Sequence, residues 1–550
     1  MNSRYDVRKW WLPLLILWAF GSTSDALAQS RREGSVSVKD FGAKGDGVTD
    51  DRAAIQAAID SAKTGAVYFP PAPKGYLIAP APGKRTFLEL RSNVQLIGEG
   101  NPAIRVASKS APYDSVLSAS LCDDCVIQDL TIDSNIGSNA IKDKAEIYAH
   151  PRFEISFGAG HHIRVDRVTF ENSSSVNSIV SGTPVRDIGV IHCTFKWVGD
   201  DANHISHDNS AVYIHADGAV IEGNIFKALR RDAPAPGTAI ETHGSHISVI
   251  GNVITDYGAG MNITGIAPMD SEGIVVRNNT IEGAAFGIEI WSHAYAAHTS
   301  GYGINGLSIT DNHLVINQTS YLSSQSKIGA TSGIAVEPTS NLPITNLNIS
   351  NNVILFDLEN EPRTTVSSSM GIGWWSAAGQ TAENLTIENN TIENGPVAGI
   401  RLAAGLKKCQ IKNNIIKNTG SSLDRTIAGT YKTPIFIVGA PSTDVEVSDN
   451  HIIDSLEPSR IRTAILLGTL SGTSSGVRLR NNSVSVHGAN KTSFKSHLEL
   501  LDNSTMPLLT ETWDDFAAPT KKVAPGSSVH NSKSGGSWVA SAAGTLSKQP

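Results

Sequence analysis

Residues 387–392 read IENNTI, and variants of this short phrase recur along most of the chain. Close copies are VIEGNIF at 220, VIGNVI at 249, VRNNTI at 276, ITDNHL at 309, ISNNVI at 349, IKNNII at 411, VSDNHI at 447 and LRNNSV at 479. Each copy carries one Asn in the same slot: Asn224, Asn252, Asn279, Asn312, Asn352, Asn390, Asn414, Asn450 and Asn482. Earlier copies without that Asn are IQDLTI at 127, VDRVTF at 165 and VIHCTF at 190. The phrase therefore marks a repeat of irregular length.

Repeats of this length, built from short strands and tight turns, are typical of a solenoid whose units cannot bury their apolar faces alone. Stacking like on like places one Asn above the next, and their amides then hydrogen-bond along the stack. The repeat predicts an all-β fold, a parallel β-helix of about a dozen coils, and it predicts that the Asn column is structural.

The composition agrees with a large β-structured body. Of the 550 residues, 18% are charged and 6% aromatic, and 49 are Gly. The net charge of -7, without a long run of Lys or Arg, argues against nucleic acid as a partner.

The ends of the chain are interpreted separately. Residues 1–28 have a basic start, an apolar run and a small-residue cleavage pattern, which predicts a signal peptide and a secreted or periplasmic protein. No later segment is apolar for long enough to span a membrane. We expect an N-terminal cap and first coils at 36–115, the β-helix at 116–490, a C-terminal cap at 491–516 and a disordered, Ser/Gly-rich tail at 517–550.

The predicted cap contains a Gly/Asp turn, a helix that begins after Thr49 as its N-cap, and the strand Ala66 to Phe69. A helix here would close the open end of the solenoid. The residues VKDFGAKGDG at 38–47, TDD at 49–51, AIQAAI at 54–59 and VYFP at 67–70 resemble the start of rhamnogalacturonase/epimerase-like proteins of the pectate lyase superfamily. The resemblance implies a right-handed parallel β-helix that acts on polysaccharide, by a reaction it does not specify.

Four cysteines are too few for a disulfide scaffold. Cys122 and Cys125 form a CxxC whose second pair of zinc ligands is absent from the sequence. A local disulfide and two unpaired thiols remain equal alternatives, and no metal site is predicted.

A second strand recurs between the Asn slots, as AVYIH at 211, AIETH at 239, GMNIT at 260, GIEIW at 287, GIAVE at 333 and GIGWW at 371. Its second and fourth positions are mostly apolar and should face the core, so its third and fifth positions should face outward. We also align Phe153–Ser156 here, which places Glu154 in the third position. The outward slots then gather one face of polar and aromatic side chains: Tyr213, His215, Glu241, His243, Asn262, Glu289, Trp291, Glu337 and Trp375.

This face predicts a polysaccharide site. Glu241 and Glu289 lie two coils apart, about 9.6 Å along the stack, near the upper end of the carboxylate spacing of an inverting glycosidase. We expect one to be general acid and the other general base, with His243 assisting. The remaining residues of the face would bind sugar. For each Glu taken alone, a solvated surface carboxylate is the simpler interpretation.

The loops that precede these strands add further candidates. Arg230 and Arg231 are expected to bind substrate. Gly199-Asp200-Asp201 resembles the GDD of the polygalacturonase family, which implies catalytic roles for Asp200 and Asp201, with a turn-forming pair as the alternative.

The leading expectation is a secreted glycoside hydrolase that needs no cofactor. One alternative is a polysaccharide lyase, which removes a proton next to a uronate carboxylate and needs a cation such as Ca²⁺, with Tyr213, Tyr257 or His243 as base. Another is a non-catalytic protein of exopolysaccharide binding or assembly.

Overall fold

The computed structural model describes residues 35–549 apart from internal segments at 141, 174–175, 197–208, 229–236, 266–270, 293–302, 318–330, 339–343, 358–368, 376–380, 421–431, 457–460, 487–493, 495, 502–504 and 514–520. The predicted signal peptide lies outside the described residues. Within the described ranges, no helix has the length and apolar character needed to cross a membrane.

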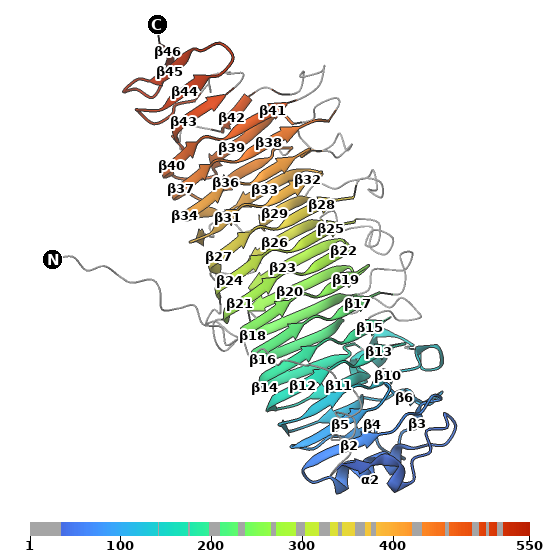
Figure 1. The fold of residues 1–550 in the computed structure, drawn as a ribbon. Helices are drawn as coiled ribbons and strands as arrows, with labels where there is room; N and C mark the ends of the chain where they lie inside the picture. The colour runs from blue at the N-terminus through green and yellow to red at the C-terminus, as the bar shows by residue number, and fades with distance from the viewer. Residues whose placement is uncertain are drawn as a thin grey trace, which may run out of the picture.

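The chain winds into a right-handed parallel β-helix that forms one long column (Figure 1). Each coil contributes one strand to each of three faces. The first face stacks β4 (Thr86–Glu89), β7 (Ser115–Ala119), β11 (Phe153–Phe157), β14 (Ile179–Ile191), β16 (Ser210–Glu222), β18 (Thr238–Ile250), β20 (Ala259–Gly265), β23 (Phe286–Ser292), β26 (Ser332–Pro338), β29 (Met370–Trp375), β33 (Ala398–Ala403), β36 (Ile435–Gly439), β39 (Thr463–Thr469) and β42 (Ser496–Leu500).

The second face continues round a bend in the same coils. It stacks β1 (Val36–Ser37), β2 (Gly65–Phe69), β5 (Val94–Gly98), β8 (Cys122–Asp123) with β9 (Val126–Gln128), β12 (Gly160–Asp166), the second halves of β14, β16 and β18, β21 (Ser271–Arg277), β24 (Ile304–Thr310), β27 (Ile344–Ser350), β30 (Thr381–Glu383) with β31 (Thr386–Glu388), β34 (Gly405–Lys412), β37 (Thr443–Ser448), β40 (Ser475–Arg480) and β43 (Leu508–Trp513).

The third face is a separate parallel sheet of 14 strands. Its strands are β3 (Tyr76–Ile78), β6 (Ala103–Val106), β10 (Thr131–Asp133), β13 (Thr169–Glu171), β15 (Thr194–Lys196), β17 (Ile225–Lys227), β19 (Val253–Thr255), β22 (Thr280–Ala284), β25 (His313–Ile316), β28 (Val353–Phe356), β32 (Thr391–Glu393), β35 (Ile415–Lys417), β38 (His451–Asp454) and β41 (Ser483–Val486). The described coils thus slightly exceed the predicted dozen.

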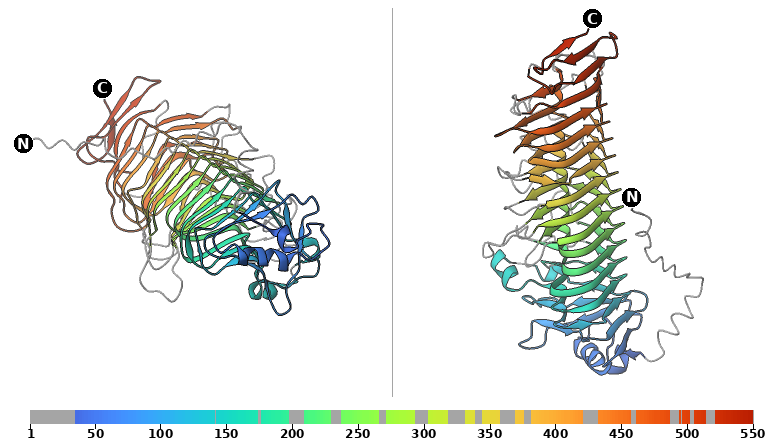
Figure 2. Two further views of the ribbon diagram at one scale, coloured as in Figure 1. Left: turned by 60° about the horizontal axis from the view of Figure 1, so that its bottom comes forward. Right: turned by 90° about the vertical axis from the view of Figure 1, so that its left-hand side faces the viewer.

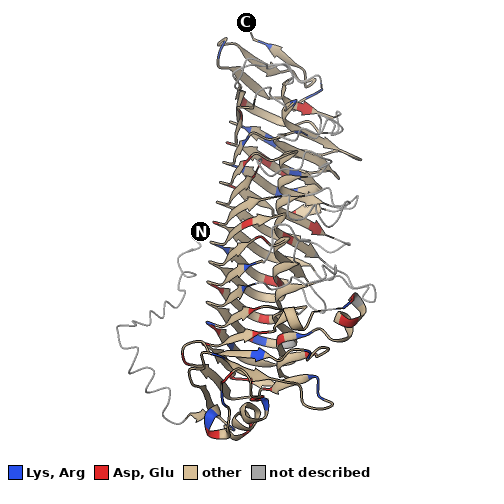
Figure 3. Ribbon diagram, turned by 90° about the vertical axis from the view of Figure 1, so that its right-hand side faces the viewer, with Lys and Arg blue, Asp and Glu red and all other residues tan. Residues whose placement is uncertain are grey.

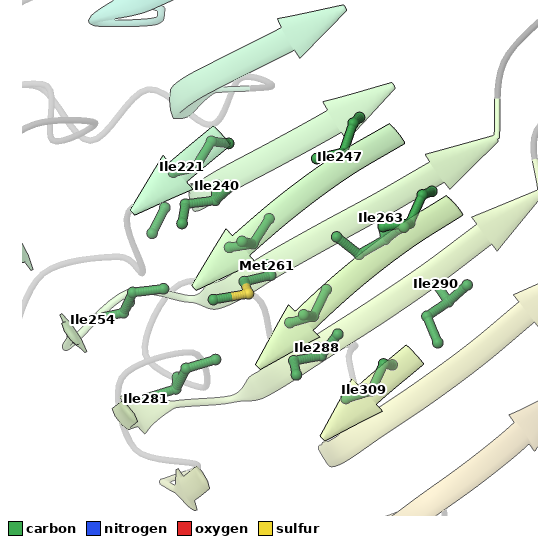
Figure 4. Close-up of a cluster of buried hydrophobic side chains, with 14 of the residues drawn as sticks. Ile221, Ile240, Ile247, Ile254, Met261, Ile263, Ile281, Ile288, Ile290 and Ile309 are labelled. Carbon is green, nitrogen blue, oxygen red and sulfur yellow. The ribbon is translucent and has the colours of Figure 1, made fainter. Parts of the chain in front are cut away.

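The core is the inside of this column, where like side chains stack on like. Ile240, Met261 and Ile288 are paired in register on consecutive strands and point into one apolar interior (Figure 4). On the third face the rings of Phe170, Phe195 and Phe226 stack with centroids 4.8 and 4.4 Å apart. Because β alternation turns every second residue inward, the apolar period of the sequence fixes which side chains face out.

The Asn column forms the predicted ladder between the second and third faces. Each Asn side chain donates to the Oδ1 of the next, from Asn224 to Asn252 at 2.9 Å through to Asn450 and Asn482 at 2.9 Å. These residues are at most 1% exposed. At the C-terminal end Glu511 takes the place of the next Asn, and its two carboxylate oxygens accept from the backbone N and Nδ2 of Asn482 at 2.8 Å each. The prediction of a structural role is confirmed.

The N-terminal cap contains a short 3-10 turn, η2 (Val38–Phe41), and helix α2 (Arg52–Ser61), which lies across the open end of the column (Figure 2). Its buried residues Ile55, Ala58 and Ile59 cover that end. The predicted N-cap is wrong by two residues: Asp51 occupies the position, while Thr49 Oγ1 donates instead to Asp46 Oδ2 at 2.8 Å in the preceding turn. Two further short helices, η3 (Ile136–Ser138) and α3 (Lys144–Ala149), lie before β11.

The predicted disordered tail is also wrong in its described part. Strand β44 (Ser528–Asn531) extends the second face, and β45 (Ser537–Ala540) and β46 (Leu546–Lys548) follow it as antiparallel neighbours. Val523 and Val529 are buried there. A Ser/Gly-rich composition suits the tight turns of such hairpins as well as it suits disorder, and two buried valines supply the apolar anchor.

Candidate active site on the first face

The strand register confirms the predicted alignment of the outward face. Tyr213 pairs with Glu241, Glu241 with Asn262, and Asn262 with Glu289, and we call this column the Glu row. The adjacent column, the His row, consists of His215, His243, Thr264, Trp291 and Glu337 in successive register. The two rows are two residues apart on each strand and therefore lie on the same side of the sheet.

Glu241 is the most tightly held carboxylate of the Glu row. Its Oε1 lies 2.8 Å from Nε2 of His243, and its Oε2 accepts a short hydrogen bond from Ser210 Oγ. The side chains of Glu241 and His243 are only 13% and 5% exposed. A carboxylate that is positioned from both oxygens is fixed in orientation, as a base or nucleophile must be.

Two rings lie beside His243 on the N-terminal side of the site. The Tyr213 ring centroid lies 4.7 Å from that of His243, and the His215 centroid lies 5.5 Å from it. Burial, together with the neighbouring His243, lowers the pKa of His215 to about 4. His215 is consequently a neutral imidazole near pH 7.

The pKa of Glu289 is shifted in the opposite direction from that of His215. It is 6% exposed, and burial, reinforced by Glu337 and Glu241, raises its pKa to about 8. With its nitrogen turned towards Glu289, the Asn262 amide donates to Oε2 at 2.9 Å, and its oxygen accepts from Thr238 Oγ1 at 3.2 Å. Asn262 thus separates Glu241 from Glu289 and orients the latter. The site therefore contains a carboxyl that keeps its proton at neutral pH.

The C-terminal part of the face is aromatic and less acidic. Trp291 and Glu337 are partly exposed, and burial also raises the pKa of Glu337. Trp375 is partly exposed at the end of β29, where the Arg401 guanidinium lies 5.4 Å from its ring and 5.3 Å from the ring of Phe436. Between Glu289 and Arg401 the Glu row holds only Ala335 and Gly373.

Four predicted site residues cannot be placed on this face. Asp200, Asp201, Arg230 and Arg231 lie outside the described residues. The nine others, Tyr213, His215, Glu241, His243, Asn262, Glu289, Trp291, Glu337 and Trp375, are described, and all lie on the first face.

Two residues of the site were missed by the sequence analysis. Ser210 and Thr238 pair with each other at the start of β16 and β18, and each contacts a residue of the Glu row on the following strand. The sequence signal for them is a Ser or Thr placed two residues before the apolar second position of the recurring pentapeptide. Both lie before the aligned pentapeptide, where the simple in–out alternation ends.

Two other expectations are wrong. Ser156, not Glu154, is in register with Tyr213 through Val180, and Glu154 is fully buried with Ser134 Oγ donating to it at 2.6 Å. The predicted alignment of β11 is out by two residues, because its Glu-Ile dipeptide resembles the Glu-Ile of the later strand GIEIW. Tyr257 is also fully buried, packed against Phe226, so it is not available as a base for a lyase.

Charged residues of both signs lie along the described part of the column. In the side view of Figure 3, Lys and Arg are interspersed with Asp and Glu among mostly uncharged residues.

Comparison with known proteins places the chain in a family. The rhamnogalacturonase A/epimerase, pectate lyase-like family matches residues 35–322, more than half of the chain, and the chain belongs to that family of carbohydrate-active β-helix proteins. Two similar curated proteins are mannuronan C5-epimerases of Azotobacter vinelandii. AlgE6 is 35% identical over 146 residues, which are 25% of this chain and 16% of the relative. AlgE4 is 50% identical over 66 residues, 12% of each protein.

Solved structures agree on the fold. The tailspike protein of E. coli bacteriophage HK620, in complex with a pentasaccharide, matches with a TM-score of 0.57 at 16% identity. The match covers 95% of this chain and 91% of the tailspike chain. A double mutant of the same tailspike reaches a TM-score of 0.64 at 16% identity over 95% of this chain and 91% of that one. At this identity the likeness concerns the β-helix itself.

Proposed function

We propose that the protein is an exported glycoside hydrolase that cleaves a polysaccharide bound along the first face. The observation that carries this proposal is the pair Glu241 and Glu289, two carboxyls in one row with opposite environments. Burial raises the pKa of Glu289 to about 8, so the carboxyl is protonated at neutral pH, as a general acid must be. Glu241, positioned by Ser210 and His243, is the base that activates water.

The spacing of the pair favours inversion. The two strands that carry them are separated by β20, so their backbones are about 9.6 Å apart, near the upper end of the range of about 6.5–9.5 Å for carboxyls that leave room for a water. In the proposed step Glu289 gives its proton to the leaving glycosidic oxygen. Glu241 takes a proton from the water that attacks the anomeric carbon. Both protons are accounted for, and no cofactor is needed.

The aromatic groups supply the sugar-binding surface. Trp291 lies two residues beyond Glu289 on the same strand, and Trp375 lies two coils further along. Indole rings suit the apolar face of a pyranose, while the polar groups of the Glu row suit its hydroxyls. The same face therefore offers both binding and chemistry.

The test is turnover by Glu241→Gln and Glu289→Gln, each compared with Glu272→Gln as the control. Glu272 is an exposed carboxylate on the second face, outside the site. Neutral and uronic polysaccharides are incubated with each variant, and new reducing ends are counted. Both site variants should lose about 10²–10⁴-fold in rate while the control is unchanged. Retained activity in both site variants would contradict the assignment. Binding without any cleavage by the wild type would instead indicate a non-catalytic binding protein.

A second candidate is chemistry at C5 of a uronate, favoured by the similarity to the mannuronan C5-epimerases. His215, kept neutral by its environment, or Tyr213 would take the proton next to the carboxylate. A Ca²⁺ ion is the usual neutraliser of that carboxylate. Asp200 and Asp201 lie outside the described residues, and the described His, Cys, Asp and Glu of this face do not gather three close ligand atoms, so no step is derived through such an ion.

The two candidates give different products. Hydrolysis produces reducing ends and no unsaturated sugar, β-elimination produces a conjugated, ultraviolet-absorbing end, and epimerisation exchanges the C5 hydrogen with solvent deuterium without shortening the chain. Mannuronan in heavy water, followed by NMR and by reducing-end analysis, separates the three outcomes.

A further inference from the structure

A second cluster of reactive side chains lies outside the proposed active site, at the bend between the first and second faces. It begins at the CDDC segment, where Cys122 and Cys125 form a disulfide. The bridge closes a ring of four residues whose two central members are Asp123 and Asp124. These carboxylates are therefore presented on a constrained loop.

The next coil brings two histidines to the same point. Strand β12 pairs with β8 so that Gly160 lies opposite Cys122 and His161 opposite Asp123. His161 Nδ1 lies 2.7 Å from Asp123 Oδ1, and His162 Nδ1 lies 3.1 Å from Asp124 Oδ1. The two imidazole centroids are 4.5 Å apart. Two histidines and two aspartates from adjacent coils thus form one cluster.

The following coil adds another carboxylate. Asp187 Oδ2 lies 3.9 Å from Nε2 of His162, on the side opposite Asp124. One ligand atom each from Asp124, His161 and His162 lies within 4.8 Å of the others. Three successive coils therefore contribute to a compact set of nitrogen and oxygen donors at the surface.

Backbone conformation alone accounts for part of this cluster. Asp124, His162 and Asp187 all have a positive φ at the bend, and Asp and His are among the residues that tolerate it. His161 is different, because its backbone needs no left-handed conformation, yet its imidazole joins the group. The disulfide on the neighbouring coil is also unexplained by the bend.

We propose that Asp124, His161 and His162 form a binding site for a divalent transition metal of the Zn²⁺ class. Two imidazoles and a carboxylate are a ligand set that such ions prefer. Asp123 Oδ1 lies 2.7 Å from Nδ1 of His161, and this ion-pair contact leaves Nε2 for the metal and orients the ring, as outer-shell carboxylates do. Binding would tie two adjacent coils together beside the disulfide.

The test is isothermal titration of untagged, EDTA-treated protein with Zn²⁺, with Co²⁺ absorption as a second readout of coordination. The site variant is the double substitution His161→Gln and His162→Gln. The matched control is His246→Gln on the same bend. His246 also lies between two carboxylates, 2.8 Å from Asp217 and 3.9 Å from Glu272, but has no second histidine beside it. Asp123→Asn tests the orienting contact.

The expected result is a Zn²⁺ binding event that disappears in the double variant, weakens about 10–100-fold in Asp123→Asn and is unchanged in His246→Gln. Bound Zn²⁺ should also raise the Tm of the wild type and of the control, but not that of the double variant. All the substituted side chains are partly exposed, so folding should be preserved. Absence of binding by the wild type, or equal binding by the double variant, would overturn the proposal.

Discussion

Nε2 of His243 lies 2.8 Å from Oε1 of Glu241, two residues earlier on the same strand. This contact exists because alternate residues of a strand share a face, and it uses the imidazole to hold the carboxylate rather than to face solvent. His243 Nδ1 is buried without a hydrogen-bond partner among the described residues. His243 is therefore positioned to orient Glu241.

Replacing His243 by Gln should lower kcat more than it raises KM, because the change disturbs the base without removing a sugar contact. We expect a loss of about 10²-fold in kcat. Steady-state kinetics on the cleaved polysaccharide measure both constants. His246→Gln is the control, and an effect confined to KM would show that His243 binds substrate instead.

The raised pKa of Glu289 predicts how stability depends on pH. The group titrates at about 8 in the folded protein and at about 4.5 when unfolded, so unfolding between these values releases a proton. Its contribution is fully present below about pH 4.5 and is lost as pH rises towards 8, by at most about 1.4 kcal/mol per pH unit. Glu289→Gln cannot release that proton.

Denaturation of the wild type and of Glu289→Gln across pH 5–9 checks this expectation. The stability of the variant relative to the wild type should increase with pH through that window. Titrating groups that do not interact with Glu289 cancel in the difference. A difference that does not change with pH would contradict a buried, protonated Glu289.

The aromatic part of the face predicts a binding defect separate from chemistry. Trp375→Ala should raise KM, or weaken binding of an uncleaved oligosaccharide, by about tenfold, equal to about 1.4 kcal/mol. Its kcat should stay close to that of the wild type, since Trp375 lies two coils beyond Glu289. Trp538→Ala, in the C-terminal hairpins, is the matched control. Unchanged binding by Trp375→Ala would remove this residue from the sugar surface.

The Asn ladder predicts a sharp contrast between neighbouring residues. Asn352 Nδ2 donates to Asn390 Oδ1 at 3.0 Å and to Ile309 O at 2.9 Å, and its Oδ1 accepts from Asn312 Nδ2 at 2.9 Å. Asn352→Ala should cost about 2–4 kcal/mol, because buried polar groups of both neighbours lose partners.

The control for this prediction is Asn351→Ala. Asn351 is exposed and has a φ of 58°, so its replacement should cost about 1–2 kcal/mol through backbone strain alone. Thermal unfolding compares the two variants. Equal losses of stability in the two variants would mean that the ladder hydrogen bonds of Asn352 do not stabilise the fold.

The β-helix, the Asn ladder and the outward position of Glu241 and Glu289 could all be predicted from the repeat pattern. These features depend on a period of two along each strand and on stacking of like residues between coils. Both rules act locally and hold in every coil, so each repeat of the sequence supports the same prediction. Where a copy was misaligned, at Glu154, the true register was set by pairing with β7 and β14 rather than by its letters.

The chemistry of individual groups depends on contacts between coils, which the repeat pattern does not show. Glu241 and Glu289 have equivalent positions in the repeat, yet one is held by Ser210 and His243 while the other is buried beside Asn262 and Glu337. The CxxC lacked a second ligand pair in sequence, and the pairing of β12 with β8 brings His161 opposite Asp123. Protonation and metal coordination depend on distances of a few ångströms between side chains of different coils, and loops of unequal length hide those distances from the sequence.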